Sequence, residues 1–405
     1  MTNTGRIAAL VFLAGVFVME GYDIAAMGLA VPRLGDALEL EATSFGWVFT
    51  ALLVGIGIGG AGLAPFGDRL GRRTLIVAGC IATGIFTLAT STATSIGEFL
   101  AWRGLTGIAL GAALPNVSAL SAEIAPAKWR ATVMAIVSAG IPLGIAVAGV
   151  MARYVIDAAG WQGLFYVPGL FALVLAVVLY LLLEGGPPES AAGADKAASV
   201  PQVQLFRQPW VLPFAVFATI LALNALNLYL LNSWVPTVLP LAGFSLDDAA
   251  TISGIVQFAG LGIGVAASFG VDRWNKSLSL VLMFGAMALC FLGVSMTAPE
   301  PTLWIALLCV GVGGASAGGM VLPALCVYLF APRLLSTAIG LGVMVARLGA
   351  FAGPLVGQAI LDAEAGPNAF FFAAFVPAAL CAVMALLVPM ALKVKQREEA
   401  EAEPA

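Results

Sequence analysis

The chain of 405 residues is 61% hydrophobic and 10% charged, with a mean hydropathy of +1.03 and a formal net charge of −4. A soluble protein carries roughly a quarter of its residues as charged side chains, so this composition excludes a soluble globule and predicts a protein whose solvent is lipid. The chain has no histidine, which excludes histidine-based metal sites and catalytic triads. Its five cysteines lie scattered in apolar runs without a CxxC pair, so we expect no metal, no cofactor and no disulfide framework.

Twelve apolar runs follow one another along the chain, each long enough for a membrane-spanning helix of about 20 residues. Their approximate limits are 7–31, 43–66, 74–92, 97–122, 131–152, 163–183, 209–235, 249–270, 278–297, 301–330, 337–360 and 369–392. The stretch 185–208 is rich in Gly, Pro, Ala and Ser and predicts a flexible cytoplasmic linker. The predicted fold is therefore an all-α membrane protein of two six-helix bundles, residues 1–184 and 209–405, the second ending in a short acidic cytoplasmic tail.

Basic residues are distributed unevenly between the two sides of these runs. If the N-terminus is cytoplasmic, Arg33 and Arg153 are the only basic residues on the opposite side, while Arg103 and Arg347 fall inside spans. Because cytoplasmic loops are enriched in Lys and Arg, this bias predicts a multi-pass protein of the inner (plasma) membrane with both termini in the cytoplasm.

Each half of the chain also contains a similar loop. Asp68-Arg69 follows the second run and Asp272-Arg273 follows the eighth, which indicates an internal repeat. Repeats of this kind are typical of carriers that expose one central site alternately to the two sides of the membrane.

Four charged side chains lie well inside the runs: Glu20, Asp23, Arg103 and Arg347. Each costs about 2.5 to 3.5 kcal/mol or more at the bilayer centre, so they are functional candidates. Glu20 and Asp23 share one helix face, where repulsion and desolvation favour a bound proton on at least one of them. We therefore predict that Glu20 and Asp23 carry protons and that Arg103 couples to them. A purely structural ion pair with Arg103 is the alternative.

Arg347 has no acidic residue in its own or neighbouring runs, so its expected partner is a substrate carboxylate, which it would bind through a bidentate hydrogen bond. The alternative is an arginine that reaches toward the cytoplasmic surface. Neutral polar and aromatic residues in the runs complete the predicted substrate site, although helix–helix hydrogen bonding and anchoring at the membrane interface are their alternative roles. These residues are Tyr22, Asn116, Asn227, Asn232, Trp234, Gln257 and Tyr328.

Several motifs resemble a known family. The twelve runs, the loop Asp68-Arg69-Leu70-Gly71-Arg72-Arg73 and Arg103 resemble the major facilitator superfamily over essentially the whole chain. Within it, the chain resembles the aromatic acid:proton symporters through the segments Glu20-Gly21-Tyr22-Asp23, Leu114-Pro115-Asn116, Asn232-Ser233-Trp234-Val235-Pro236-Thr237 and Ala346-Arg347-Leu348-Gly349.

The resemblance implies the major facilitator fold and import of an aromatic or related organic acid anion together with protons. It implies that Glu20 and Asp23 are the protonation sites and that Arg347 lies near the substrate carboxylate. It also implies a cytoplasmic gate, in which Asp68 interacts with the positive end of a helix dipole. The gate residues are Asp68, Arg69, Gly71, Arg72 and Arg73. The expected partners are the anion, protons and the lipid bilayer, without nucleic acid, and the expected functional form is a monomer.

Three other functions are alternatives to such import. A proton-coupled drug or metabolite exporter of the same superfamily is the main alternative, but exporters usually have a Gly-Pro pair where this chain has Ile141-Pro142, and Arg347 favours an anionic substrate. A receptor that does not transport stays possible because a fold does not fix a function. An intramembrane enzyme is not expected, because the runs contain no nucleophile or metal constellation.

Overall fold

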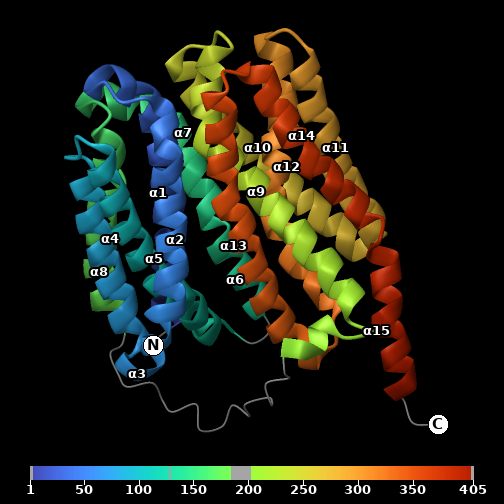
Figure 1. Cartoon of the computed structure of the whole chain (residues 1–405). Helices are drawn as coiled ribbons and strands as arrows, with labels where there is room; N and C mark the ends of the chain where they lie inside the picture. Colours follow the sequence, from blue (N-terminus) through green and yellow to red (C-terminus); the bar gives the residue numbers. More distant parts are fainter. Residues whose placement is uncertain (1–2, 127–128, 184–201, 403–405) are drawn as a thin grey trace. The chain divides into compact units, whose positions relative to one another are not determined.

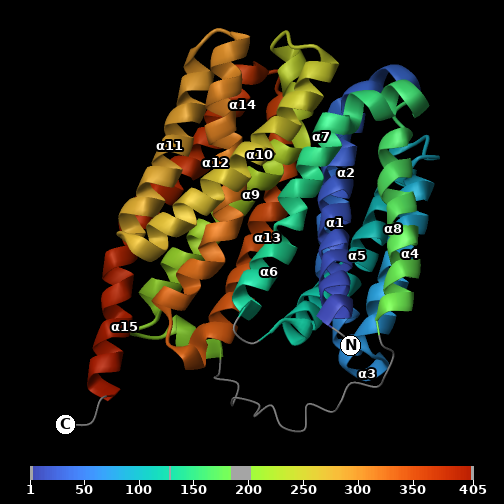
Figure 2. The same cartoon turned by 180° about the vertical axis from the view of Figure 1, so that it is seen from behind.

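The computed structural model describes residues 3–126, 129–183 and 202–402, and this part of the chain is built from helices and connecting loops without strands (Figures 1 and 2). Twelve helical spans in it are long and apolar enough to cross a membrane, which confirms the predicted all-α, twelve-span class. The α-helices are α1 Asn3–Leu38, α2 Gly46–Gly62, α3 Gly67–Leu70, α4 Arg72–Thr90, α5 Ile96–Ile124, α6 Arg130–Ser138, α7 Gly140–Ala159, α8 Gly163–Leu182, α9 Val211–Leu241, α10 Leu246–Arg273, α11 Lys276–Met296, α12 Pro301–Leu329, α13 Pro332–Asp362, α14 Gly366–Ala385 and α15 Val388–Ala402, and short 3-10 helices cover η1 Ala42–Phe45, η2 Ala64–Phe66 and η4 Gln202–Phe206.

Several helices begin at capping side chains that are visible in the sequence. Ser95 accepts a hydrogen bond from the backbone N–H of Glu98 at the start of α5, and Asn275 caps α11 in the same way. Glu300 accepts the N–H groups of two residues in the first turn of α12, whose first residue is Pro301. These caps satisfy N–H groups that would otherwise lack a partner, and they explain why the predicted starts of these spans lie within two residues of the observed ones.

The fifth span differs from its prediction of 131–152. It consists of α6 and α7, which are interrupted at Ala139, and it continues to Ala159. Pro142 has no N–H to give to the carbonyl of Ser138, which accounts for the break between the helices. Arg153, the residue after the predicted end, and Asp157 both lie on an exposed part of α7, where the helix can continue.

The last span also has two parts, α14 and α15, and ends beyond the predicted position 392. Pro389 cannot donate a hydrogen bond to the carbonyl of Ala385, one helical turn earlier. The hydroxyl of Ser277 on α11 donates to this carbonyl instead, at 2.7 Å. The helix break therefore provides an acceptor that fastens α11 to α14.

The described residues group into two compact units. The first is Met1–Gly193 with Asn232–Gln257, and the second is Ala194–Leu231 with Phe258–Ala405. The end of α9 and the start of α10 thus pack with the N-terminal spans, a grouping that differs from a division at residue 209. The predicted bundle limits stay a prediction, and of the linker 185–208 only 202–208 falls within the described residues.

In the first unit, α1 packs against α5, α7 and α8, and α4 lies beside α8 (Figures 1 and 2). Glycines bring α2 and α5 into backbone contact: a Cβ atom at Gly55, Gly59, Gly107 or Gly111 would collide with a main-chain carbonyl of the facing helix. Small residues permit such close approach, which gives α2 and α5 a tight interface in the absence of a hydrophobic driving force between helices. In the second unit, α11 packs against α12 and α14.

Candidate functional site

The predicted pair of Asp23 and Arg103 is formed in the first unit. Asp23 lies on α1 and Arg103 on α5, and their side chains are 0% and 1% exposed. Arg103 Nη1 donates to Asp23 Oδ1 at 2.8 Å, and Arg103 Nη2 donates to the main-chain oxygen of Asp23 at 3.0 Å. A guanidinium keeps its charge in a protein, so Arg103 places a permanent positive charge beside this buried carboxyl group.

A third residue contacts this pair. Thr87 on α4 is 0% exposed, and its hydroxyl donates to Asp23 Oδ1 at 3.1 Å. Two donors therefore meet at one carboxylate oxygen, while the buried Oδ2 of Asp23 has no hydrogen-bond partner among the described residues. Sequence reasoning missed Thr87 because a neutral hydroxyl costs little in an apolar run. The available signal was the spacing of Thr83, Thr87 and Thr90, which places three hydroxyl groups on one face of α4.

Glu20 and Tyr22 lie beside Asp23 on α1, and both are buried, at 5% and 4% exposure. The residue between them, Gly21, is required by close packing, because a Cβ atom there would collide with the main-chain carbonyl of Ile141. This approach brings α7 against the segment that holds the acidic residues. The Tyr22 hydroxyl is buried and has no hydrogen-bond partner among the described residues.

The neutral polar residues predicted in the first unit mostly bond to other helices. Asn116 Nδ2 donates to the main-chain oxygens of Ala64 and Ala112, at 3.1 and 2.9 Å, which ties α5 to η2. Gln257 Nε2 donates to Asn232 Oδ1 at 2.8 Å. These contacts agree with helix–helix hydrogen bonding, the alternative role of such residues.

The predicted aromatic contact Trp234 is fully buried in the first unit. Its ring meets that of Phe49 edge to face, with the ring centres 5.2 Å apart.

The second unit holds the other predicted substrate residues. Arg347 on α13 is partly exposed, and within the described part of its unit no carboxylate lies at ion-pair distance from it. Asn227 Nδ2 donates to the main-chain oxygen of Ala374 at 2.9 Å, so it joins α9 to α14. The Asn227 Oδ1 atom is buried and has no partner among the described residues.

Tyr328 lies apart from these residues, near the connection between α10 and α11. Its hydroxyl donates to Asp272 Oδ1 at 2.8 Å, and Lys276 Nζ lies 4.3 Å from its ring centre. These contacts do not support a substrate role for Tyr328, which stays a prediction.

The predicted gate residues form one cluster at the end of α2. Asp68 pairs with Arg72 at 3.4 Å, and Arg72 pairs with Glu123 of α5 at 2.6 Å. Gly71 has a φ of 90°, a conformation that glycine adopts without strain. Arg73 donates to the main-chain oxygen of Tyr180 and lies 4.4 Å from its ring centre. The cluster is thus fastened to α5 and α8.

Arg69, the remaining predicted gate residue, belongs to the same cluster. Its guanidinium lies 5.9 Å from the ring centre of Phe66.

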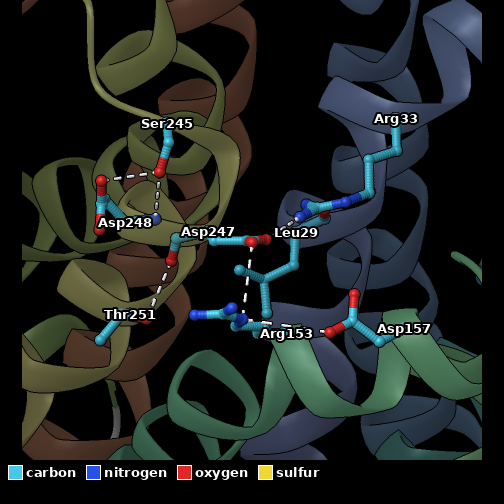
Figure 3. Close-up of polar contacts among 8 residues, drawn as sticks. All are labelled: Leu29, Arg33, Arg153, Asp157, Ser245, Asp247, Asp248 and Thr251. Carbon is cyan, nitrogen blue, oxygen red and sulfur yellow. Dashed lines mark hydrogen bonds and ion pairs between the residues drawn. The ribbon is translucent and has the colours of Figure 1, made fainter.

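A second charged cluster lies around the start of α10 (Figure 3). Asp247 Oδ1 is 2.9 Å from Arg33 Nη2 of α1, and Asp247 Oδ2 is 3.8 Å from Arg153 Nε of α7. Arg153 also lies 4.0 Å from Asp157. Arg33 and Arg153 are the two basic residues predicted on the side opposite the cytoplasm, but sequence reasoning gave them no partner.

Comparison with known proteins places these features in context. Residues 12–354 match the model of the Major Facilitator Superfamily. The chain is 31% identical to the 4-hydroxybenzoate transporter PcaK of Pseudomonas aeruginosa, over 94% of this chain and 92% of that protein. It is 29% identical to the 3-(3-hydroxy-phenyl)propionate transporter of Escherichia coli (93% and 92% covered) and 29% identical to the gallate transporter of Pseudomonas putida (94% and 90% covered). These matches confirm the family resemblance predicted from the motifs.

Solved structures agree on the fold. The crystal structure of a bacterial homologue of the human lysosomal transporter Spinster, inward-facing and unoccupied, has a TM-score of 0.77 at 16% identity and covers 97% of this chain and 98% of its own. A D-xylose-proton symporter has a TM-score of 0.75 at 19% identity, with 96% and 97% covered.

Proposed function

Because the chain belongs to the major facilitator superfamily and is a multi-pass membrane transporter rather than an enzyme, we propose that it imports an aromatic acid anion together with protons by alternating access. The observation that carries this proposal is the buried contact of Asp23 with Arg103, because it joins a carboxylate that can take up a proton to a cation that cannot lose one.

Proton uptake by Asp23 would change the net charge of its pair with Arg103. With Asp23 ionised, the two buried charges compensate each other. A proton on Oδ2 removes the negative charge and leaves Arg103 with an excess positive charge in a region of low dielectric constant. That state favours rearrangement of α1 against α5, which is how proton binding would drive a change of conformation. Glu20, one turn earlier on α1, is a second proposed proton carrier.

An aromatic carboxylate is the proposed substrate. The three relatives are named for acids that share an aromatic ring, at least one hydroxyl group and a carboxylate. In this chain, Arg347 is the proposed partner of the carboxylate through its planar guanidinium. Tyr22, whose buried hydroxyl has no partner among the described residues, is a proposed contact for a substrate hydroxyl.

The positive-inside bias supports an inner-membrane location with both termini in the cytoplasm. In this orientation each proton that enters across a potential of 100 mV contributes about 2.3 kcal/mol and each anion charge costs the same amount, so the potential favours accumulation inside when more protons than anion charges enter together. The proposed functional form is a monomer with lipid around it and no nucleic acid.

Transport by the purified protein in liposomes tests the proposal. Labelled 4-hydroxybenzoate should accumulate when the outside is acidic and should only equilibrate when the proton gradient is collapsed. The variant Asp23→Asn should lose accumulation, while Glu364→Gln, a change at an exposed loop residue, should retain it. Accumulation that is independent of the gradient, or gradient-driven accumulation by Asp23→Asn, would refute proton coupling at this site.

A further inference from the structure

We propose that Thr87 is a positioning residue that selects Oδ2 of Asp23 as the oxygen that takes the proton and sets the pH at which it does so. This inference rests on the proposed proton-coupled transport. Thr87 comes from α4, the third helix at a contact otherwise formed by α1 and α5.

The hydrogen bond of Thr87 differs from those of its neighbours. Thr90 and Thr106 donate to main-chain oxygens four residues earlier in their own helices, at 2.9 and 2.8 Å. This is the usual solution for a hydroxyl in an apolar helix. Thr87 instead donates across the interface to Asp23 Oδ1. A hydroxyl that leaves its own helix for a buried carboxylate stabilises the charged form of that carboxylate.

The surroundings of Asp23 contain few other groups that could take over this role. Arg103 is the charged residue that contacts it, and Glu20 is the other acidic residue on the buried face of α1. The charged residues of α4 are Arg72 and Arg73, at the opposite end of that helix, and α8 has none.

The remaining charged residues lie farther along their helices: Arg6, Arg33 and Asp36 on α1, and Glu98 and Glu123 on α5. Arg153 and Asp157 of α7 lie near its C-terminal end, and Arg130 begins α6. Thr87 is therefore the one neutral donor seen at the carboxylate within the described residues.

The arrangement determines where the proton goes. Oδ1 already accepts two hydrogen bonds, from Arg103 and Thr87, and a proton placed there would displace one of them. Oδ2 is buried and accepts none within the described part of the chain, so a proton placed on it disturbs neither bond. Without Thr87, the ionised form loses one of its two side-chain donors, and Asp23 should take up its proton at a higher pH.

The pH profile of substrate uptake tests this role. Thr87→Val keeps the shape of the side chain and removes the donor, so the midpoint of the profile should move up by about one pH unit. Thr87→Ser restores a hydroxyl and should return the midpoint to that of the wild type. Thr90→Val, a change on the same helix at a threonine bonded to its own backbone, is the matched control and should not move it. An unchanged midpoint in Thr87→Val would overturn the inference.

Two further measurements separate the possible failures. Exchange of labelled for unlabelled substrate at equal pH reports folding and binding without a proton gradient, and Thr87→Ala repeats the test if Thr87→Val is inactive in exchange. When this exchange is measured at several pH values in an Asp23→Asn background, Thr87→Val should not change its pH dependence, and a shift there would overturn the inference. A wild-type protein whose uptake does not depend on pH would instead refute the proposed function itself.

A different set of side chains carries a second inference. We infer that Asp247 is an ionic latch that holds the turn between α9 and α10 to α1 and α7. Asp247 bridges Arg33 and Arg153, which come from two different helices (Figure 3). Ser245 stabilises the start of α10, because its hydroxyl accepts the N–H of Asp248 and donates to the Asp248 carboxylate.

The backbone beneath the latch is closely packed. A Cβ atom at Gly28 of α1 would meet the main-chain oxygen of Asn232 at 2.8 Å, and one at Gly149 of α7 would collide with the backbone of Gly254. The turn is covalently joined through α9 and α10 to the second unit. Any movement that separates this turn from α1 and α7 must therefore break the contacts of Asp247.

The charges of the cluster argue for a latch rather than for an anion site. Arg33 and Arg153 are matched by Asp157 and Asp247, which leaves no excess positive charge to attract a substrate anion. Arg33 is only 14% exposed, whereas Arg153 is 62% exposed and its pairs are open to screening by salt. The bond from Arg33 to Asp247 is therefore the stronger part of the latch.

Reversible cross-linking tests the latch. In a variant carrying Arg33→Cys and Asp247→Cys, a short bis-methanethiosulfonate linker should join the two positions, abolish transport and release it again on reduction. Each single variant, treated with the same reagent, is the matched control and should keep its activity. Failure of the linker to join the two positions, or full transport by the joined protein, would overturn the inference.

Discussion

Neutralising Asp23 should destabilise the first unit, because it leaves Arg103 as an uncompensated buried charge. In Asp23→Asn the shape of the side chain is kept, and Arg103 Nη2 still has its bond to the main-chain oxygen of residue 23. Loss of one partner of a buried ion pair costs about 3 to 5 kcal/mol, and the retained backbone bond favours the lower end, about 3 kcal/mol. The loss is large for any single substitution.

The double variant Asp23→Asn with Arg103→Gln supplies the control. It removes both charges and keeps two amides that can hydrogen-bond, so it should recover much of the loss, as expected where a buried ion pair is replaced rather than broken. Thermal unfolding of the purified proteins in one detergent measures the order of stability. A single variant as stable as the wild type, or a double variant less stable than the single one, would show that Arg103 does not depend on Asp23 for its charge compensation.

Three further predictions concern other parts of the chain. Gly59→Val should prevent α2 from reaching α5 and abolish folding, whereas Gly62→Ala should be tolerated because no atom of another helix lies within 4 Å of the added carbon; the yield of monodisperse protein in detergent distinguishes the two variants. Arg347→Lys keeps the charge but loses the two-pronged hydrogen bond, so the KM for an aromatic acid should rise about tenfold in uptake kinetics, and an unchanged KM would exclude Arg347 as its partner. A hydrogen bond to Asp272 raises the pKa of the Tyr328 hydroxyl. The stability that this bond gives to the folded protein is therefore present below the ordinary tyrosine pKa and is lost as the pH rises through the pKa of Tyr328 in the folded protein. Asp272→Asn should lower the pH at which Tyr328 forms tyrosinate, measured by ultraviolet absorbance.

The spans and the charged pair could be predicted because the membrane makes both conspicuous. Apolar runs of span length have no other use in a chain with so few charges, and helix caps such as Ser95 mark their starts. Asp23 and Arg103 stand out because a charge in lipid is costly unless it is paired or used. The sequence alone therefore indicated two members of the candidate site.

Neutral residues, whose placement in the membrane has little free-energy cost, were harder to predict as functional. Thr87 carries no charge, so its role depends on which helix lies opposite, and that is a property of tertiary packing. Asn116 and Asn227 looked like possible ligand contacts, yet each donates to a main-chain oxygen of a neighbouring element. Asp247 is separated by more than 200 positions from Arg33, and its contact follows from the position of a turn rather than from a local pattern.

The glycines between α2 and α5 have a mechanical consequence. Displacement at an ordinary helix interface is absorbed by side chains that change rotamer, but here main-chain atoms of the two helices touch directly. No compliant layer separates them, and Asn116 adds a fixed bond from α5 to the main chain of η2. We therefore expect α2 and α5 to move together as one rigid element, so that a displacement at Arg103 would reach the turn at Asp68 without being absorbed by intervening side chains.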